Sequence, residues 1–206
     1  MVKNFDTSIV YNTIASDYND CFNAISPHLD DFLNLVQPKG KILDVGCGPG
    51  VDSQYMSLKG FDVIGIDNAE QMLALARQKK SNAKFVLHDM ITWNRESSSF
   101  DAILASYSLV HIPKNKIQRV LKKFNRMLKK KGILSINIHE GESEEISIPE
   151  PFAPNLMTDL NIMSIAEIKH LLEFNGFSII NCFLEKALND KDFEDYNKLC
   201  IIAIKN

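Results

Sequence analysis

The sequence predicts a single α/β domain with a doubly wound, mostly parallel seven-stranded sheet and an antiparallel closing strand. Its 206 residues are a little more than the roughly 150 expected for one domain. Of these, 45% are hydrophobic, as in proteins that bury a sizeable core. From Lys41 onward, short apolar runs alternate with amphipathic segments, a pattern typical of parallel strands joined by crossover helices. The first apolar run ends in a glycine-rich turn.

Each short apolar run predicts a strand, and each amphipathic segment predicts a helix. The expected strands are Lys41–Val45, Phe61–Ile66, Lys84–Leu87, Phe100–Ala105, Gly132–Ile138, Phe177–Leu184 and Leu199–Ile204. The expected helices are Val51–Lys59, Ala69–Lys80, Lys114–Lys130 and Ser164–Asn175. Gly60, Gly132 and Gly176 stand where helices end. In the third helix, apolar residues recur every three or four positions and form one stripe that packs on a sheet.

Three segments lie outside this alternation. Residues Asp6–Val36 predict two helices before the first strand, the second opened by Ser26-Pro27 as N-cap and first-turn proline. The stretch Glu140–Met163 contains three prolines and is too long for an ordinary connection, so we expect it to be irregular and either functional or mobile. The last two strands, separated by the acidic segment Asn189–Asp195, are expected to pair as an antiparallel hairpin at the sheet edge.

Composition excludes several classes of protein. The net charge of −3 leaves no overall basic excess for non-specific nucleic-acid binding. The four cysteines form no C-x-x-C pair and predict neither a zinc cluster nor a disulfide framework, which favours a reducing cytoplasm. Asp6 interrupts the apolar core that a signal peptide needs, and no later apolar run approaches the roughly 18 residues of a membrane span. We therefore expect a cytoplasmic protein without a membrane segment or a metal site.

The turn after the first strand predicts a ligand site. It contains Gly46, Gly48 and Gly50. A ligand can approach a turn without side chains closely, and ligands of open parallel sheets bind beyond the carboxyl ends of the strands. The dinucleotide fingerprint G-x-G-x-x-G fails, because its third glycine would fall on Val51. The Asp44 carboxylate disfavours a pyrophosphate but suits a cofactor with ammonium and sulfonium charges, and S-adenosylmethionine carries both.

At these residues the sequence resembles the class I S-adenosylmethionine-dependent methyltransferases. Their opening motif, an acidic residue followed by three alternating glycines, is matched by Asp44, Gly46, Gly48 and Gly50. The resemblance continues through VIGIDNAEQM, VLHDM and FDAILASYSLVHIP and covers about Lys41–Ile138. It implies a Rossmann-like methyltransferase fold and S-adenosylmethionine as cofactor. On this basis the single domain divides into front helices that form a lid (1–38), a cofactor-binding core (39–139), a substrate-cap insertion (140–163) and a closing helix with two strands (164–206).

Several residues are candidate cofactor ligands. Asp67 ends the second strand, so its carboxylate can accept hydrogen bonds from two ribose hydroxyls; the alternative is a helix N-cap. The resemblance implies that Asp89 accepts a hydrogen bond from the adenine amino group and that the Met90 amide donates to a ring nitrogen. The alternative for Asp89 is an ordinary turn aspartate. The remaining candidates next to these motifs are Cys47, Asn68 and Ser106.

Four further side chains have both a functional and a structural interpretation. Met72 either packs on the adenosine or fills the core. His111, in the stretch that leaves the fourth strand, can act as a base near neutrality or only shape the pocket, because methyl transfer often needs no base. Tyr11 and Tyr18 share one helical face; they resemble the front-helix tyrosines that close over the methionine end of the cofactor, or simply pack.

The charge distribution favours a small-molecule acceptor. Residues 114–131 hold nine basic residues and no acidic one, which could form a nucleic-acid patch, although solvated charge is the usual explanation. Residues 1–38 and 140–195, which should cover the site, hold 18 acidic and 4 basic residues and would repel a polyanion. The Asn/Asp-Pro-Pro-aromatic motif and the Pro-Cys nucleophile of nucleic-acid methylation are absent. We expect a neutral or cationic small molecule, and the oligomeric state stays open.

Two alternatives remain for the function. An NAD-dependent oxidoreductase would also use a glycine-rich turn, and calorimetric titration with both cofactors separates it from a methyltransferase. A non-catalytic S-adenosylmethionine-binding protein would bind the cofactor without turnover of a labelled donor.

Overall fold

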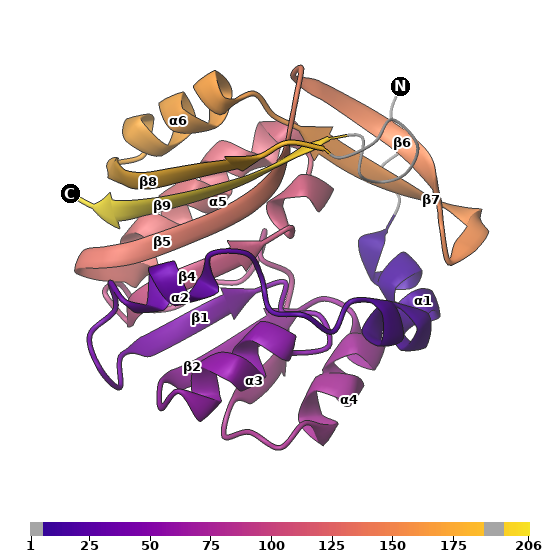
Figure 1. Ribbon diagram of the computed structural model, residues 1–206, viewed down its shortest axis with the longest axis horizontal. Coiled ribbons are helices and arrows are strands. Elements are labelled where there is room, and N and C mark those ends of the chain that lie inside the picture. Colours follow the sequence, from indigo (N-terminus) through magenta and orange to yellow (C-terminus); the bar gives the residue numbers. More distant parts are fainter. Residues whose placement is uncertain (1–5, 188–195) are drawn as a thin grey trace.

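The computed structural model describes residues 6–187 and 196–206, and one twisted sheet runs through its centre (Figure 1). In these residues seven strands pair in the order β3-β2-β1-β4-β5-β9-β8. They are β1 (Lys41–Val45), β2 (Asp62–Asp67), β3 (Lys84–Leu87), β4 (Phe100–Ser106), β5 (Leu128–Glu140), β8 (Phe177–Glu185) and β9 (Asn197–Lys205). The pairs among β1 to β5 are parallel, whereas β9 lies antiparallel between β5 and β8. The predicted fold class and the antiparallel closing pair are confirmed.

Helices cover both faces of this sheet, because successive strand residues point to opposite sides. On one face, helices α5 (Lys114–Met127) and α6 (Ile165–Phe174) share a core cluster with Leu43 and Ile103. On the other, α2 (Leu29–Leu33) and α3 (Val51–Leu58) share a cluster with the neighbouring strand residues Ile42 and Ala102. Helices on both faces make the sheet doubly wound and leave its carboxyl edge accessible.

Helix α5 ends three residues earlier than its apolar stripe predicts. Leu128 is extended, with φ −70° and ψ 140°, and pairs with Phe100 of β4. Its side chain is fully buried. The helix therefore stops at Met127, since burial in the sheet outweighs the helix-forming lysines that follow.

The N-terminal part forms two helices, as predicted, but the second begins later. Helix α1 (Thr7–Cys21) is capped by Asp6, whose side chain accepts the Ser8 amide. Helix α2 begins at Leu29, so Ser26 is not its N-cap. The Ser26 hydroxyl instead hydrogen-bonds the Asp52 carboxylate, and its backbone amide donates to the same group at 2.8 Å. Ser26 therefore binds a residue distant in the sequence in place of a local helix amide.

Residues 140–163 are not irregular, contrary to the prediction from their prolines. Strands β6 (Glu144–Glu150) and β7 (Ala153–Ile162) form a separate antiparallel two-stranded sheet. Each strand of such a ribbon has an unpaired edge, where the missing N–H of proline removes no ladder bond. Pro151 lies in the connecting turn, and the pairing register shifts at Pro149. Strand β7 packs against α1 and against the 3-10 turn η1 (Leu109–His111), so the ribbon covers the end of β4.

Two expectations concern the rest of the chain. The acidic segment Asn189–Asp195 lies outside the described residues. Within the part that the structure describes, no helix is long and apolar enough to span a membrane.

Candidate active site

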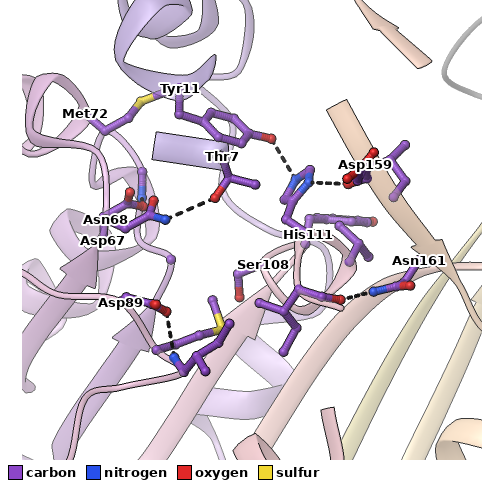
Figure 2. Close-up of a pocket in the computed structure, with 18 of the residues that line it drawn as sticks. Thr7, Tyr11, Asp67, Asn68, Met72, Asp89, Ser108, His111, Asp159 and Asn161 are labelled. Atoms are coloured by element: carbon purple, nitrogen blue, oxygen red, sulfur yellow. Dashed lines mark hydrogen bonds between the residues drawn. The ribbon is translucent and has the colours of Figure 1, made fainter. Parts of the chain in front are cut away.

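A cavity of about 360 Å³ opens at the carboxyl ends of β1, β2 and β4, between α1, helix α4 (Glu70–Gln78), η1 and β7 (Figure 2). Eleven of the fourteen residues singled out from the sequence line it. They are Tyr11, Tyr18, Gly46, Gly48, Asp67, Asn68, Met72, Asp89, Met90, Ser106 and His111. Asp44, Cys47 and Gly50 do not line it. The topology thus brings residues from five separate sequence regions to one edge of the sheet, where the motifs predicted a ligand site.

The glycine turn is folded back onto β2 and leaves one face open. Gly46 and Gly48 have φ values of +68° and +49°, a conformation that glycine adopts without strain. The Gly46 and Cys47 amides donate to the Ile66 carbonyl at 2.8 and 3.0 Å, and the Gly48 amide donates to Asp67 at 2.9 Å. A Cβ on Gly48 would meet nothing within 4 Å. The turn therefore offers a bare backbone surface to the cavity, while its amides are already satisfied.

Asp44, Cys47 and Gly50, which do not line the cavity, pack on the side of the turn that faces the protein interior. Asp44 is 2% exposed and accepts a hydrogen bond from the Ser53 hydroxyl at 2.6 Å. Burial, and then repulsion by Asp52, raise the pKa of Asp44 to about 8. Burial likewise raises the pKa of the Cys47 thiol. Gly50 faces α4 and β3, where a Cβ would meet Ala76 at 2.8 Å.

The Asp67 carboxylate holds the glycine turn against the chain that leads into α4. One carboxylate oxygen accepts the Gly48 amide and the other accepts the Ala69 amide, each at 2.9 Å. The N-cap residue of α4 is Ala69 and not Asp67, and no side chain caps this helix, so the helix-cap alternative is not confirmed. An ionised carboxylate has about four acceptor positions, so further hydrogen bonds to ribose hydroxyls stay available. Beside it, the Asn68 amide donates to Thr7 of α1 at 3.0 Å.

Asp89, which follows β3, and Met72 of α4 line another side of the cavity. Asp89 accepts the Ile91 amide at 2.7 Å, which closes the turn after β3, and the other carboxylate oxygen is not used in this turn. The Lys123 ammonium of α5 holds the turn from behind by donating to the carbonyls of Ile91 and Trp93. Met72 is 1% exposed and packs in the cluster between α1 and α4, yet it also lines the cavity.

At the other end of the cavity, His111 bridges two elements. The Tyr11 hydroxyl lies 2.7 Å from its Nε2, and its Nδ1 lies 3.4 Å from the Asp159 carbonyl (Figure 2). Because a carbonyl only accepts, Nδ1 carries the proton and Nε2 accepts from Tyr11. Burial lowers the pKa of His111 to about 4. The imidazole is therefore neutral near pH 7, with its basic nitrogen directed at Tyr11.

Both tyrosines of α1 stay protonated. Burial, and then Tyr18, raise the pKa of Tyr11 well above its usual value, and burial raises that of Tyr18 to about 12. Their rings meet edge to face with centroids 5.7 Å apart. The predicted shared helical face is confirmed, and it points toward the cavity.

Sequence reasoning missed a part-buried chain of polar side chains next to the site. The Ser26 hydroxyl links Asp52 to the Ser106 hydroxyl, 2.6 Å away, and the Asn137 amide donates to Ser106 at 3.0 Å. It also missed Asp159 and the buried Asn161 amide, which donates to the Ile112 carbonyl. Ser108 belongs to the predicted stretch after the fourth strand, and it lines the cavity. Asp159 and Asn161 lie on β7, and only the pairing of the ribbon with η1 brings them here.

The lining of the cavity is acidic. Its carboxylates are Asp6, Asp67, Asp89, Glu145 and Asp159, and the described residues that line it include no lysine or arginine. In the same described part of the chain, no group of three or more histidine, cysteine or carboxylate side chains could hold a metal ion. A cavity of this kind attracts cationic and neutral ligands and disfavours polyanions.

The sequence is similar to those of known methyltransferases. A family model described as a methyltransferase domain matches residues 42–132. A putative methyltransferase of Bacillus subtilis, YqeM, is 32% identical over 160 residues, which cover 73% of this chain and 62% of that protein. The trans-aconitate 2-methyltransferase of Variovorax paradoxus is 30% identical over 106 residues, which cover 50% of this chain and 40% of that protein. The chain thus spans less than two thirds of the length of either curated relative.

The fold has close structural counterparts. A crystal structure of an S-adenosylmethionine-dependent methyltransferase from Methanosarcina mazei matches with a TM-score of 0.74 at 22% identity. The match covers 88% of this chain and 98% of that one. At this identity the likeness shows the fold alone.

Proposed function

We propose that this chain, which belongs to the class I S-adenosylmethionine-dependent methyltransferase family, transfers a methyl group to a small-molecule acceptor. The observation that carries the proposal is the cavity itself. The open backbone at Gly48, the Asp67 carboxylate and the neutral His111 all face one space. S-adenosylmethionine, when bound, supplies an electrophilic methyl group on a positively charged sulfur.

The residues present fit that cofactor. Gly48 leaves room for a ligand to contact the backbone of the turn. Asp67 can accept from ribose hydroxyls while it holds the turn, and Asp89 with Met90 can serve the adenine. The acidic lining suits a ligand with ammonium and sulfonium charges. A dinucleotide fits less well, because the amides of Gly46, Cys47 and Gly48 are already used inside the turn and cannot bind a pyrophosphate.

His111 is the candidate base at the acceptor end. Its Nε2 lone pair accepts from Tyr11, and a nucleophile that displaced this bond could donate its proton to the same nitrogen. The Asp159 carbonyl fixes the tautomer that makes Nε2 basic. The low pKa makes His111 a weak base, so its main contribution is to orient the acceptor in attack geometry.

The charge of the cavity limits the acceptor to a neutral or cationic molecule. Trans-aconitate, the tricarboxylate in the name of one relative, would face five carboxylates and, among the described lining residues, no lysine or arginine. The basic residues of helix α5 do not provide a cation either, because none of them lines the cavity. The acidic lining therefore supports a different, neutral or cationic acceptor for this chain.

Isothermal titration calorimetry tests the cofactor assignment. We expect S-adenosylhomocysteine to bind and NAD not to bind. Binding of NAD without binding of S-adenosylhomocysteine would refute the proposal in favour of an oxidoreductase. Transfer of a labelled methyl group from S-adenosylmethionine to members of a panel of amines, phenols and thiols then tests the reaction. Cofactor binding without transfer to any panel member would favour a non-catalytic role.

A further inference from the structure

Ser108 is a buried polar residue that the site described above leaves unused. It lines the cavity and is 7% exposed, and its hydroxyl has no hydrogen-bond partner among the described residues. Leaving a buried hydroxyl unpaired costs about 1–3 kcal/mol, so such groups are rare in folded proteins. A ligand in the cavity would supply the missing partner.

Ser108 packs directly against the glycine turn. A Cβ on Gly46 would lie 2.4 Å from the Ser108 Cβ, so the two residues are in direct contact. The preceding residue, Tyr107, has a φ of +48°, which is costly for a residue with a side chain. Figure 2 shows Ser108 between the carboxylates of Asp67 and Asp89 on one side and His111 on the other.

The described lining of the cavity offers an anionic group neither a lysine or arginine nor a free amide of the glycine turn. The turn amides of Gly46, Cys47 and Gly48 are used internally. The cofactor nevertheless ends in an amino acid, whose carboxylate requires hydrogen-bond donors once it leaves water. The Ser108 hydroxyl is an uncommitted donor beside the turn, between the adenosine side and the acceptor side.

We infer that Ser108 donates a hydrogen bond to the carboxylate of the bound cofactor, in a cavity whose described lining residues include no lysine or arginine. The inference rests on the proposed cofactor. It assigns Ser108 to ligand binding rather than to the fold. It also gives a reason for Gly46, because any side chain there would displace the serine.

The test compares three ligands on Ser108→Ala and on the wild type by calorimetry. The ligands are S-adenosylhomocysteine, its decarboxylated analogue and 5′-methylthioadenosine, which lacks the whole amino-acid group. A hydrogen bond to a charged group contributes about 1.5–3 kcal/mol. We therefore expect the substitution to weaken S-adenosylhomocysteine binding at least about tenfold and to leave the other two ligands within about twofold. Ser97→Ala, the same change at an exposed position outside the cavity, serves as control.

The unliganded protein provides an independent measurement. Because Ser108→Ala removes an unpaired buried hydroxyl, its melting temperature should equal or exceed that of the wild type. A lower melting temperature with parallel losses for all three ligands would show a structural role and overturn the inference. Unchanged S-adenosylhomocysteine affinity would overturn it as well. Failure of the wild type to bind S-adenosylhomocysteine would instead refute the proposed function.

Discussion

The Tyr11 hydroxyl and Nε2 of His111 lie 2.7 Å apart, although 100 residues separate them in the sequence. The bond joins helix α1, from the N-terminal segment, to the turn that leaves β4. It closes one end of the cavity beyond β4. Since a single side-chain hydrogen bond contributes only about 1 kcal/mol, this closure is reversible.

Replacing Tyr11 by Phe should loosen α1 without unfolding the protein. The ring keeps its edge-to-face contact with Tyr18, whereas the bond to His111 is lost. We expect a loss of stability of about 1 kcal/mol and faster amide hydrogen exchange in α1. Tyr55→Phe is the matched control, because it removes the hydrogen bond from the Tyr55 hydroxyl to Asp30, which lies outside the cavity. If α1 exchanges at the same rate in Tyr11→Phe and the wild type, the bond does not hold the helix.

The pKa of His111 predicts a pH dependence of stability. Its folded-state pKa is about 4, below the value of about 6.5 in an unfolded chain. Between these pH values the unfolded state binds more protons, so stability falls as the pH is lowered from about 6.5 to about 4. His111→Gln lacks this titration. We expect the melting-temperature difference between wild type and variant to shrink from pH 7.5 to pH 5; a constant difference would contradict the assigned burial.

Asp67 should matter for ligand affinity more than for the fold. Asp67→Ala removes the acceptor proposed for the ribose and should weaken S-adenosylhomocysteine binding roughly ten- to hundredfold. It also leaves the Gly48 and Ala69 amides without their acceptor, so a modest fall in melting temperature is expected. Asp62→Ala, at the exposed start of the same strand, is the control. An unchanged dissociation constant would refute the ribose assignment.

Gly46→Ala and Gly48→Ala form a matched pair of variants that separates stability from ligand binding. Both have positive φ, so alanine carries a similar backbone cost of roughly 1–2 kcal/mol at either position. At Gly46 the new Cβ would also collide with Ser108, whereas at Gly48 it would project into open space. Thermal denaturation should therefore show Gly46→Ala as the less stable variant. Gly48→Ala should fold and yet bind S-adenosylhomocysteine less well; equal affinity to the wild type would remove Gly48 from the binding surface.

The sequence predicts the parts of the site that local patterns encode. The spacing of Gly46 and Gly48, and the place of Asp67 at the end of an apolar strand, depend only on the chain near them, and all three line the cavity. Asp44 belongs to the same motif, but its burial under the turn depends on Ser53 of the following helix. A motif shows which residues recur together and not which of them face the ligand.

Other features depend on contacts that no local pattern encodes. The β6–β7 ribbon is not predicted from the sequence, because its segment contains three prolines and proline generally disfavours strands. Proline is nevertheless tolerated at the free edges of such a ribbon. Without the ribbon, neither Asp159 nor Asn161 could be placed near His111. Local rules favour Ser26 as a helix N-cap, whereas in the fold its amide donates to Asp52, 26 residues away.

We expect helix α1 and the β6–β7 ribbon to form a lid that opens and closes over the cavity. Strands β6 and β7 form a sheet of their own, and an isolated two-stranded hairpin is marginally stable in water. Helix α1 is held to the core by polar contacts such as Thr7–Asn68 and Tyr11–His111 and by the small cluster around Ile14. These segments should open more readily than the central sheet, and a ligand that contacts both should close them.

Hydrogen exchange tests this lid directly. Backbone amides in residues 8–19 and 142–159 should exchange more slowly with saturating S-adenosylhomocysteine than without it, while amides of β5 serve as the internal reference. Closure would exclude water, which otherwise competes with the acceptor for space and disturbs in-line geometry. Equal exchange in both states, also with acceptor analogues present, would mean that the cavity is preformed. Specificity would then reside in fixed residues such as Tyr107 and His111.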